Sequence, residues 1–429
     1  MVARRLACVL TAGLLAASCS LANRISDDSV DYNLALENAA NRSILSNVLR
    51  AKDRKRLHFT ALSQIRGQLK FQAETSTSAT IPFGGGSDDK YVLSPSAGVT
   101  YSTSPSFDVA VLDSQKFMRG ILSPVKMEVF DHYWEQGWPR EILLHMFIHR
   151  IEFSKNIEID SKVYSSVNNF TGSKHRMETF QKFIRWLLVK GLRPGRLKTV
   201  TKIGPAFAGS TINLEQLVKA AEQKLSVSQV GRTANYQLER KSSSVVFCIS
   251  SELETARANR RKSYGEASDV INLENRTCKA TSDSDSDQEG ITSLGISFGQ
   301  EYSETVKLPG GQSVLVKIPN DTKFAFYIRS IEAMIYYLGE ITRTLEEKDR
   351  EVQIFVNRKP ASLFTLMKKE PPEGFSLQVA YDGSIYGMAR RKAEVDRSMH
   401  VLSLVGQLLA LNKSADEIPS TQAVTVVGP

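Results

Sequence analysis

A long run of alternating apolar and polar residues is the feature that most restricts how this chain can fold. From Gln68 to Ile81 every odd-numbered position is apolar or threonine, and every even-numbered position is polar. A similar alternation follows from Tyr91 to Ser102, after the glycine-rich segment 84–89. Alternation with period two predicts β-strands, because successive side chains of a strand point to opposite faces. We therefore predict a long β-hairpin over residues 68–105.

The predicted hairpin is compatible with two environments. Each run is long enough for a membrane-crossing strand, which needs about 10 residues, apolar toward lipid and polar toward a lumen. One hairpin cannot close a pore, so several subunits would each contribute one. The alternative is a soluble hairpin with one face packed on the core, which produces the same alternation.

The amino-terminal segment carries the pattern of a secretory signal. Arg4 and Arg5 precede an apolar run over residues 6–17, which is too short to span a bilayer. Small residues then lead to Cys19, as in a bacterial lipoprotein signal, where the thiol takes a lipid and cleavage precedes the cysteine. We predict a signal peptide over 1–18 and lipid, including palmitate, on Cys19.

One position departs from this lipoprotein pattern. Ala16 stands where leucine is preferred, three residues before Cys19, so an ordinary signal peptide with a chance cysteine is the alternative. Ser20 follows Cys19 and resembles an outer-membrane sorting signal rather than an inner-membrane one. We therefore expect a tether over residues 19–32 that attaches the chain to the periplasmic face of the outer membrane.

The cysteines suggest one disulfide. Cys8 leaves with the signal peptide and Cys19 carries lipid, so Cys248 and Cys278 remain in the mature chain. In an oxidising periplasm this pair predicts a bond that stabilises the fold by about 3 kcal/mol. The alternative is two separate buried thiols. The cysteine spacing does not indicate a zinc site.

The remaining periodicities predict an α+β fold, with mixed helices and mostly antiparallel strands in addition to the long N-terminal hairpin. A polar segment over 257–290 is predicted to link an N-terminal α+β region, 33–256, to a C-terminal α+β region, 291–429. Helices are predicted over residues 27–52, 113–119, 125–134, 139–154, 175–190, 213–225, within 322–347 and over 394–411, and Gly191 is predicted to end the helix over 175–190. Strands are predicted over residues 197–203, 236–249, 314–318, 352–356, 375–380, 384–389 and 423–427, and Asp382-Gly383 is predicted as the turn of the hairpin formed by 375–380 and 384–389.

Two groups of residues have spacings that could hold a metal ion. Glu141, His145, His149 and Glu152 would share one stripe if 139–154 were a single helix, but they do not form the metalloprotease pattern. The alternating acids of segment 283–289 lack the glycine and the final glutamate of a calcium loop. A packed helix and a solvated acidic loop are the simpler interpretations, so we predict no metal site.

The net charge of +9 is compatible with a position near anionic lipid headgroups, lipopolysaccharide or cell-wall polymers, although a generally solvated surface is the simpler interpretation. A basic cluster, Lys52, Arg54, Lys55 and Arg56, follows the first predicted helix. It could contact headgroup phosphates, although a solvated helix end is the simpler interpretation.

Several short segments resemble a group of uncharacterised proteobacterial lipoproteins. The similar segments lie near both ends of the mature chain: 33–37 (NLALE), 47–51 (NVLRA), 58–63 (HFTALS), 106–112 (SFDVAVL) and 397–402 (RSMHVL). The resemblance implies a bacterial envelope protein and is consistent with a lipid anchor. It implies no activity.

Nucleophile-elbow and phosphate-loop patterns are absent from the sequence. We therefore expect a non-catalytic envelope lipoprotein, a membrane-anchored scaffold or assembly subunit without a cofactor. Its expected partners are the membrane, through the lipid, and other envelope proteins or further copies of itself, and not nucleic acid. The alternatives are a subunit of an oligomeric outer-membrane pore or export channel, and a periplasmic enzyme or ligand-binding protein.

Overall fold

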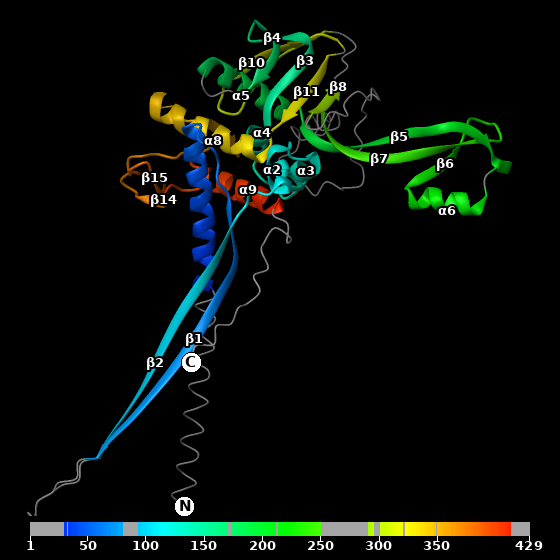
Figure 1. Ribbon diagram of the computed structural model, residues 1–429. Helices are drawn as coiled ribbons and strands as arrows, with labels where there is room; N and C mark the ends of the chain where they lie inside the picture. Colours follow the sequence, from blue (N-terminus) through cyan, green and yellow to red (C-terminus); the bar gives the residue numbers. More distant parts are fainter. Residues whose placement is uncertain are drawn as a thin grey trace, which may run out of the picture. The chain divides into compact units, whose positions relative to one another are not determined.

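Figure 1 displays the chain in a computed structural model. The chain divides into two compact units. Of the described residues, the first unit contains those up to Leu36 and those from His58 to Phe117. The second contains Glu37–Leu57 and Met118–Asn412. The described residues are 30–31, 33–79, 93–169, 173–211, 213–249, 291–295, 301–320, 322–348 and 350–412.

The first unit is built around the predicted hairpin, which is longer than the sequence indicated. Strands β1 (Thr60–Ala79) and β2 (Leu93–Val111) pair antiparallel along their whole length, with one bulge near Leu62. The amide of Leu112 donates to the carbonyl of Phe59 at 3.0 Å and continues the ladder by one step. The Phe59 ring contacts Phe117 edge to face, with 5.5 Å between centroids, at the start of helix α2 (Gln115–Leu122).

An antiparallel sheet forms the centre of the second unit. Its strand order is β8-β11-β3-β10-β9, and β4 also pairs with β3. The strands are β3 (Ile148–Ile159), β4 (Lys162–Asn168), β8 (Ile291–Gly295), β9 (Tyr302–Lys307), β10 (Ser313–Ile318) and β11 (Lys323–Ile328). Strands from both sides of the segment 257–290 therefore belong to one sheet, and regions 33–256 and 291–429 share a core.

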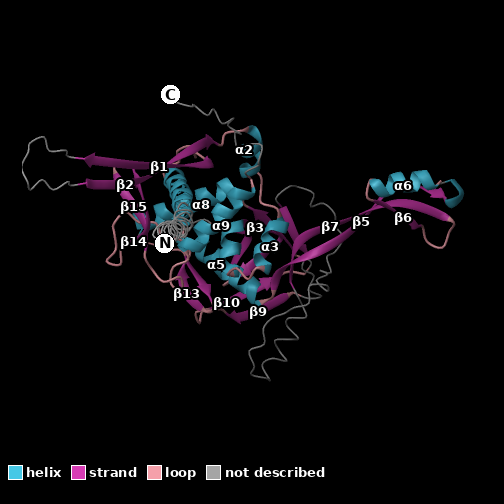
Figure 2. Cartoon of the chain, turned by 90° about the horizontal axis from the view of Figure 1, so that it is seen from below, coloured by secondary structure: helices cyan, strands magenta, loops and turns pink. Residues whose placement is uncertain are grey.

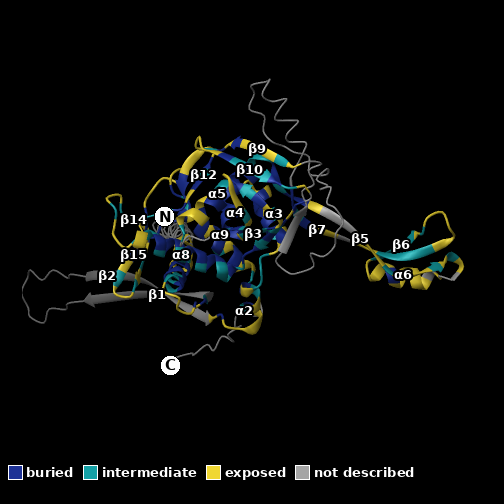
Figure 3. Ribbon diagram, turned by 90° about the horizontal axis from the view of Figure 1, so that it is seen from above, coloured by how far each residue is buried: buried dark blue, intermediate teal, exposed yellow. Residues whose placement is uncertain are grey.

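Helices pack against this sheet and against one another, as the buried segments in Figure 3 indicate. On α5 (Lys174–Val189), Phe183 contacts Phe153 of β3 and Phe324 of β11, at centroid distances of 5.2 and 5.7 Å. The other helices of the core are 33–52, α3 (Met127–Glu135), α4 (Arg140–Phe147), α8 (Ile331–Lys348) and α9 (Ser398–Leu411).

The helix over residues 33–52 approaches α8 very closely. Leu45, Val48 and Leu49 are completely buried. A Cβ atom added to Gly339 of α8 would lie 2.6 Å from the backbone nitrogen of Lys52. Only glycine permits this spacing, because any side chain would force the two backbones apart.

A two-stranded ribbon forms an arm within the second unit, which Figure 2 displays with its small tip. Strands β5 (Leu192–Ala208) and β7 (Asn235–Ile249) pair antiparallel, and β6 (Leu225–Gln229) joins the far half of β7. Helix α6 (Leu214–Glu222) contacts β6. The base of the arm is anchored by the buried Phe247, whose ring lies 4.6 Å from that of Phe326.

Two short hairpins complete the second unit. They are β12 (Gln353–Val356) with β13 (Lys359–Ser362) and β14 (Phe375–Tyr381) with β15 (Ser384–Ala389). Asp382 and Gly383 have φ angles of 48° and 70°. The turn predicted from this dipeptide is confirmed, because both residues adopt the positive φ that a tight hairpin turn requires.

The α+β fold class is confirmed, but one predicted helix is too long. Residues 139–154 form α4 only as far as Phe147, and β3 begins at Ile148, because pairing with distant strands overrides the local helical pattern there. The long helix predicted within 322–347 is confirmed as α8, and the strand β11, which was not predicted, precedes it. The predicted linker 257–290 and strand 423–427 lie outside the described residues.

Candidate functional site

A polar hollow of about 190 Å³ lies between the β3–β4 turn and the outer face of α5. The turn residues Asp160 and Ser161 have φ angles of 50° and 63°, as a tight hairpin requires. Asp160 is held by the ammonium of Lys182 at 2.6 Å and by the amide of Leu315 at 3.1 Å. This end of the hollow is therefore fixed by an ion pair and a backbone hydrogen bond.

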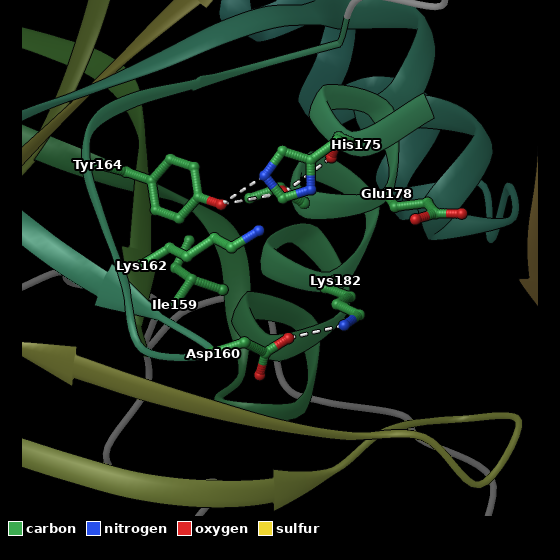
Figure 4. A pocket seen from close by; sticks show the side chains of 8 residues that line it. Ile159, Asp160, Lys162, Tyr164, His175, Glu178 and Lys182 are labelled. Carbon is green, nitrogen blue, oxygen red and sulfur yellow. Dashed lines mark hydrogen bonds and ion pairs between the residues drawn. The ribbon is translucent and has the colours of Figure 1, made fainter. Parts of the chain in front are cut away.

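Three side chains form a hydrogen-bonded row at the other end, and Figure 4 displays Tyr164 and His175 of this row. The Tyr164 hydroxyl lies 3.1 Å from His175 Nε2 and 3.4 Å from the Thr179 hydroxyl. Thr179 in turn donates to the carbonyl of His175 at 2.8 Å. Lys162 extends toward the same space from β4. The hollow thus offers hydrogen-bond donors and acceptors to a small polar group.

Helix α5 presents His175 and Glu178 to the hollow because one of its faces is apolar and buried and the other is polar and exposed. Phe180, Ile184 and Leu187 are completely buried on one face, whereas His175 and Glu178 are exposed on the other. Ser173 caps the start of the helix by accepting the amide hydrogen of Arg176. The helix ends before Gly191, whose φ of 88° allows the chain to turn away.

A second hollow, of about 340 Å³, adjoins the same helix. Its wall includes Arg185, whose Nε donates to Glu141 at 3.3 Å. Both side chains are almost completely buried, and Glu141 also accepts the amide hydrogen of Phe355 at 2.8 Å. Burial raises the pKa of Glu141 and outweighs the opposing effect of Arg185. The ion pair therefore ties α4 and α5 to β12.

A buried polar cluster links the end of β11 to α4 and α8. Arg329 donates to the carbonyls of His145 and Ile148 at 2.6 and 2.9 Å. Asn169 donates to the same His145 carbonyl and accepts from the Tyr337 hydroxyl, at 3.0 and 2.9 Å. Burial lowers the pKa of His145 to about 3 and that of Arg329 to about 10. The cluster therefore connects the end of β11 with α4 and α8, and neither hollow includes its residues.

The stripe that suggested a metal site is broken. Glu141 and His145 are buried on α4, whereas His149 and Glu152 lie on β3. Glu152 instead accepts from the Tyr327 hydroxyl at 2.5 Å. Within the described part of the chain no three histidine, cysteine or acidic side chains gather as metal ligands would. The acidic segment 283–289 lies outside that part.

Three residues of the basic cluster contact acidic or aromatic groups within their own unit. Lys52 donates to Glu346 and to the Tyr386 hydroxyl, both at 3.0 Å, and these bonds raise its pKa against the opposing effect of burial. Arg54 lies 3.6 Å from Glu340, and the Lys55 ammonium lies 5.2 Å from the centre of the Tyr381 ring. Lys52 is therefore not available to a lipid headgroup.

The other predicted site residues are only partly placed. Cys248 is buried near the end of β7. Cys19 and Cys278 lie outside the described residues, so the lipid attachment and the disulfide stay predictions. No helix in the described part of the chain combines the length and apolar character of a membrane span.

Sequence reasoning missed the hollow and the buried cluster. Tyr164, His175 and Lys182 come together because the β3–β4 hairpin packs against α5; the predicted helix over 139–154 included the first half of β3, and no strand was predicted over β4. Arg329 follows a strand that was not predicted. The alternation of Phe324, Phe326 and Ile328 was the one local signal that could have indicated it.

Comparison with known proteins gives no match. No protein-family model matches the chain, and no curated protein or solved structure is significantly similar to it. The functional argument therefore rests on the chain's own residues.

Proposed function

We propose that this protein is a lipid-anchored scaffold of the bacterial envelope that assembles with further subunits through the β1–β2 ribbon. It acts by protein contacts and not by catalysis. The observation that carries the proposal is the ribbon itself, with strands of 20 and 19 residues in one continuous antiparallel pairing.

The ribbon supports assembly because each strand leaves one edge unpaired within the described residues. A two-stranded hairpin is marginally stable by itself in water. Unpaired amide and carbonyl groups on a long edge form a template for a strand of another chain. Pairing with neighbouring copies would satisfy these groups along the full length of both strands.

The amino-terminal pattern supports the location. The lipoprotein-type signal ending at Cys19 and the following Ser20 favour attachment to the outer membrane, at its periplasmic face. Replacing Cys19 by alanine should abolish acyl labelling and release the protein into the soluble periplasm when high salt screens any remaining contacts between charges. Retention of both label and membrane association in this variant would contradict the anchor.

The assembly is tested by shortening the ribbon in register. Residues 68–104 are replaced by Asn-Gly, which joins the paired residues Gly67 and Pro105. As a matched control, residues 203–238 of the other ribbon are replaced by Asn-Gly between the paired Lys202 and Glu239. Multi-angle light scattering of the detergent-extracted protein should find an oligomer for the wild type and the control, and a monomer for the first variant. A monomeric wild type, or an unchanged oligomer in the first variant, would refute the proposal.

A subunit of an oligomeric outer-membrane pore is the second candidate, and the register of the ribbon favours it. Phe71 pairs with Tyr101 and Ala73 with Val99, so apolar positions oppose apolar positions. Gln72 pairs with Thr100, so polar positions oppose polar ones. Residues directly opposed across an antiparallel pair belong to the same face, which is the arrangement that a strand between lipid and water requires.

Site-directed labelling separates the two candidates. In a pore, cysteines at Phe71, Ala79 and Val99 should react with a lipid-soluble probe, and cysteines at Gln72, Ser78 and Thr100 with a water-soluble one. If both sets of cysteines react equally with the water-soluble probe, the pore is excluded and the scaffold remains as the proposed function.

A further inference from the structure

The arm carries most of the net charge of the protein. Between Leu192 and Ile249 there are nine lysines and arginines but only three acidic residues. The arm therefore has a formal charge of +6, out of +9 for the whole chain. Such a concentration creates a positive potential that attracts anionic partners over roughly a Debye length, about 8 Å at physiological salt.

The basic residues of the arm are largely unpaired. Arg196, Lys202, Lys224, Arg232 and Lys241 are exposed, and no carboxylate in the described part of the chain forms an ion pair with any of them. By contrast, Lys182 on α5 and Lys190, directly after α5, each contact an acidic side chain. The charge of the arm is therefore available to a partner.

One face of the ribbon gathers three of these charges around an apolar side chain. Arg196, Val200 and Lys202 occupy alternate positions of β5 and share a face, and Lys241 of β7 lies directly opposite Val200. Val200 is 51 % exposed. The one acidic residue on this face is Glu239, opposite Lys202.

We propose that this face of the arm docks on the anionic phospholipid headgroups of a bilayer. The lysine and arginine side chains would contact the phosphates, and Val200 would enter the boundary between headgroups and acyl chains. The exposed Val218 on α6, at the tip of the arm, provides a second apolar side chain of the same kind.

The same charges could attract nucleic acid, but the described part of the arm has no exposed aromatic side chains, which a surface that binds single strands also needs. Single-stranded nucleic acid is bound by exposed aromatic rings on which bases stack. The two aromatic residues of the arm outside its base, Phe207 and Tyr236, are half-buried. Exposed aliphatic side chains within a basic face favour lipid. This inference goes beyond the proposed function, because it requires no lipid on Cys19.

The test measures vesicle binding of the full chain carrying Cys19→Ala, so that an acyl anchor cannot contribute. The vesicles contain phosphatidylcholine alone or with phosphatidylglycerol. One variant removes three charges from the arm: Arg196→Gln, Lys202→Gln and Lys241→Gln. The matched control removes three exposed charges elsewhere: Lys307→Gln, Lys359→Gln and Lys392→Gln. A second comparison measures the vesicle binding of Val200→Ser on the arm, with Val163→Ser on β4 as its control, since both valines are more than half exposed.

Binding should require phosphatidylglycerol and decrease with salt. Each arm charge removed should weaken it about fivefold, or roughly a hundredfold for the triple variant. The control triple should weaken it far less, although its net charge is the same. Equal losses in the two triple variants, binding to phosphatidylcholine alone, or tighter binding to a single-stranded oligonucleotide would overturn the proposal. None of these outcomes affects the oligomeric state, which tests the proposed scaffold.

Discussion

Removing the carboxylate of Glu141 tests how the core of the second unit is held together. Glu141 and Arg185 are 4 % and 6 % exposed, and the Arg185 Nε lies 3.3 Å from a Glu141 oxygen. In Glu141→Ala the guanidinium of Arg185 stays buried without its counter-charge. Breaking a buried pair in this way typically costs about 3–5 kcal/mol.

The structure places the expected cost at the lower end of that range. Arg185 would still donate to the carbonyl of Gln353 at 3.1 Å, so part of its hydrogen bonding remains. We expect a loss of about 3 kcal/mol, which lowers the melting temperature by about 4–5 °C, because the second unit has roughly 300 residues and a correspondingly large unfolding entropy. Replacing both partners, Glu141→Leu with Arg185→Met, should restore most of the loss, because no buried charge is left.

The assay is thermal unfolding followed by circular dichroism at neutral pH. The matched control is Glu215→Ala, which breaks an exposed ion pair with Lys219 at 2.7 Å. Since both partners of that pair are more than two-thirds exposed, its loss should change stability by less than about 1 kcal/mol. A Glu141→Ala protein that melts within about 2 °C of the wild type would refute the reasoning.

Three further predictions concern a helix contact, a buried histidine and the disulfide. Gly339→Ala should destabilise the fold by about 1–3 kcal/mol, despite alanine's better helix propensity, because of the close backbone contact; the melting temperature of the variant checks this. Folded His145 has a pKa of about 3 against an unfolded value of 6.5. The buried imidazole stays neutral, so its contribution to the free energy of unfolding is fully present above pH 6.5. That free energy falls by about 2 kcal/mol between pH 6.5 and 5, where the unfolded chain takes up a proton that the folded chain does not. Urea titrations should find this pH dependence reduced in His145→Gln. Finally, a non-reduced digest should join the peptides of Cys248 and Cys278; separate peptides would indicate two free thiols.

Much of the local structure could be predicted from the sequence. The alternation over residues 68–105 predicted the β1–β2 hairpin, and Asp382-Gly383 predicted the turn between β14 and β15. The helical period followed by Gly191 predicted α5 and its end. These features depend on residues close together in the chain, whose propensities and φ preferences act locally.

Only the tertiary structure decided where helices gave way to strands and which side chains meet. Ile148 begins a strand because β3 gains partners in β4, β10 and β11, and that pairing is not encoded in local periodicity. The same pairing separates His149 from His145, and it carries the chain to the turn that places Asp160 beside α5. Arg329 is buried because the backbone carbonyls of α4 and β3 converge on it from far along the chain. The candidate site therefore arises from contacts between distant segments, whereas the elements that bear it arise from their own sequences.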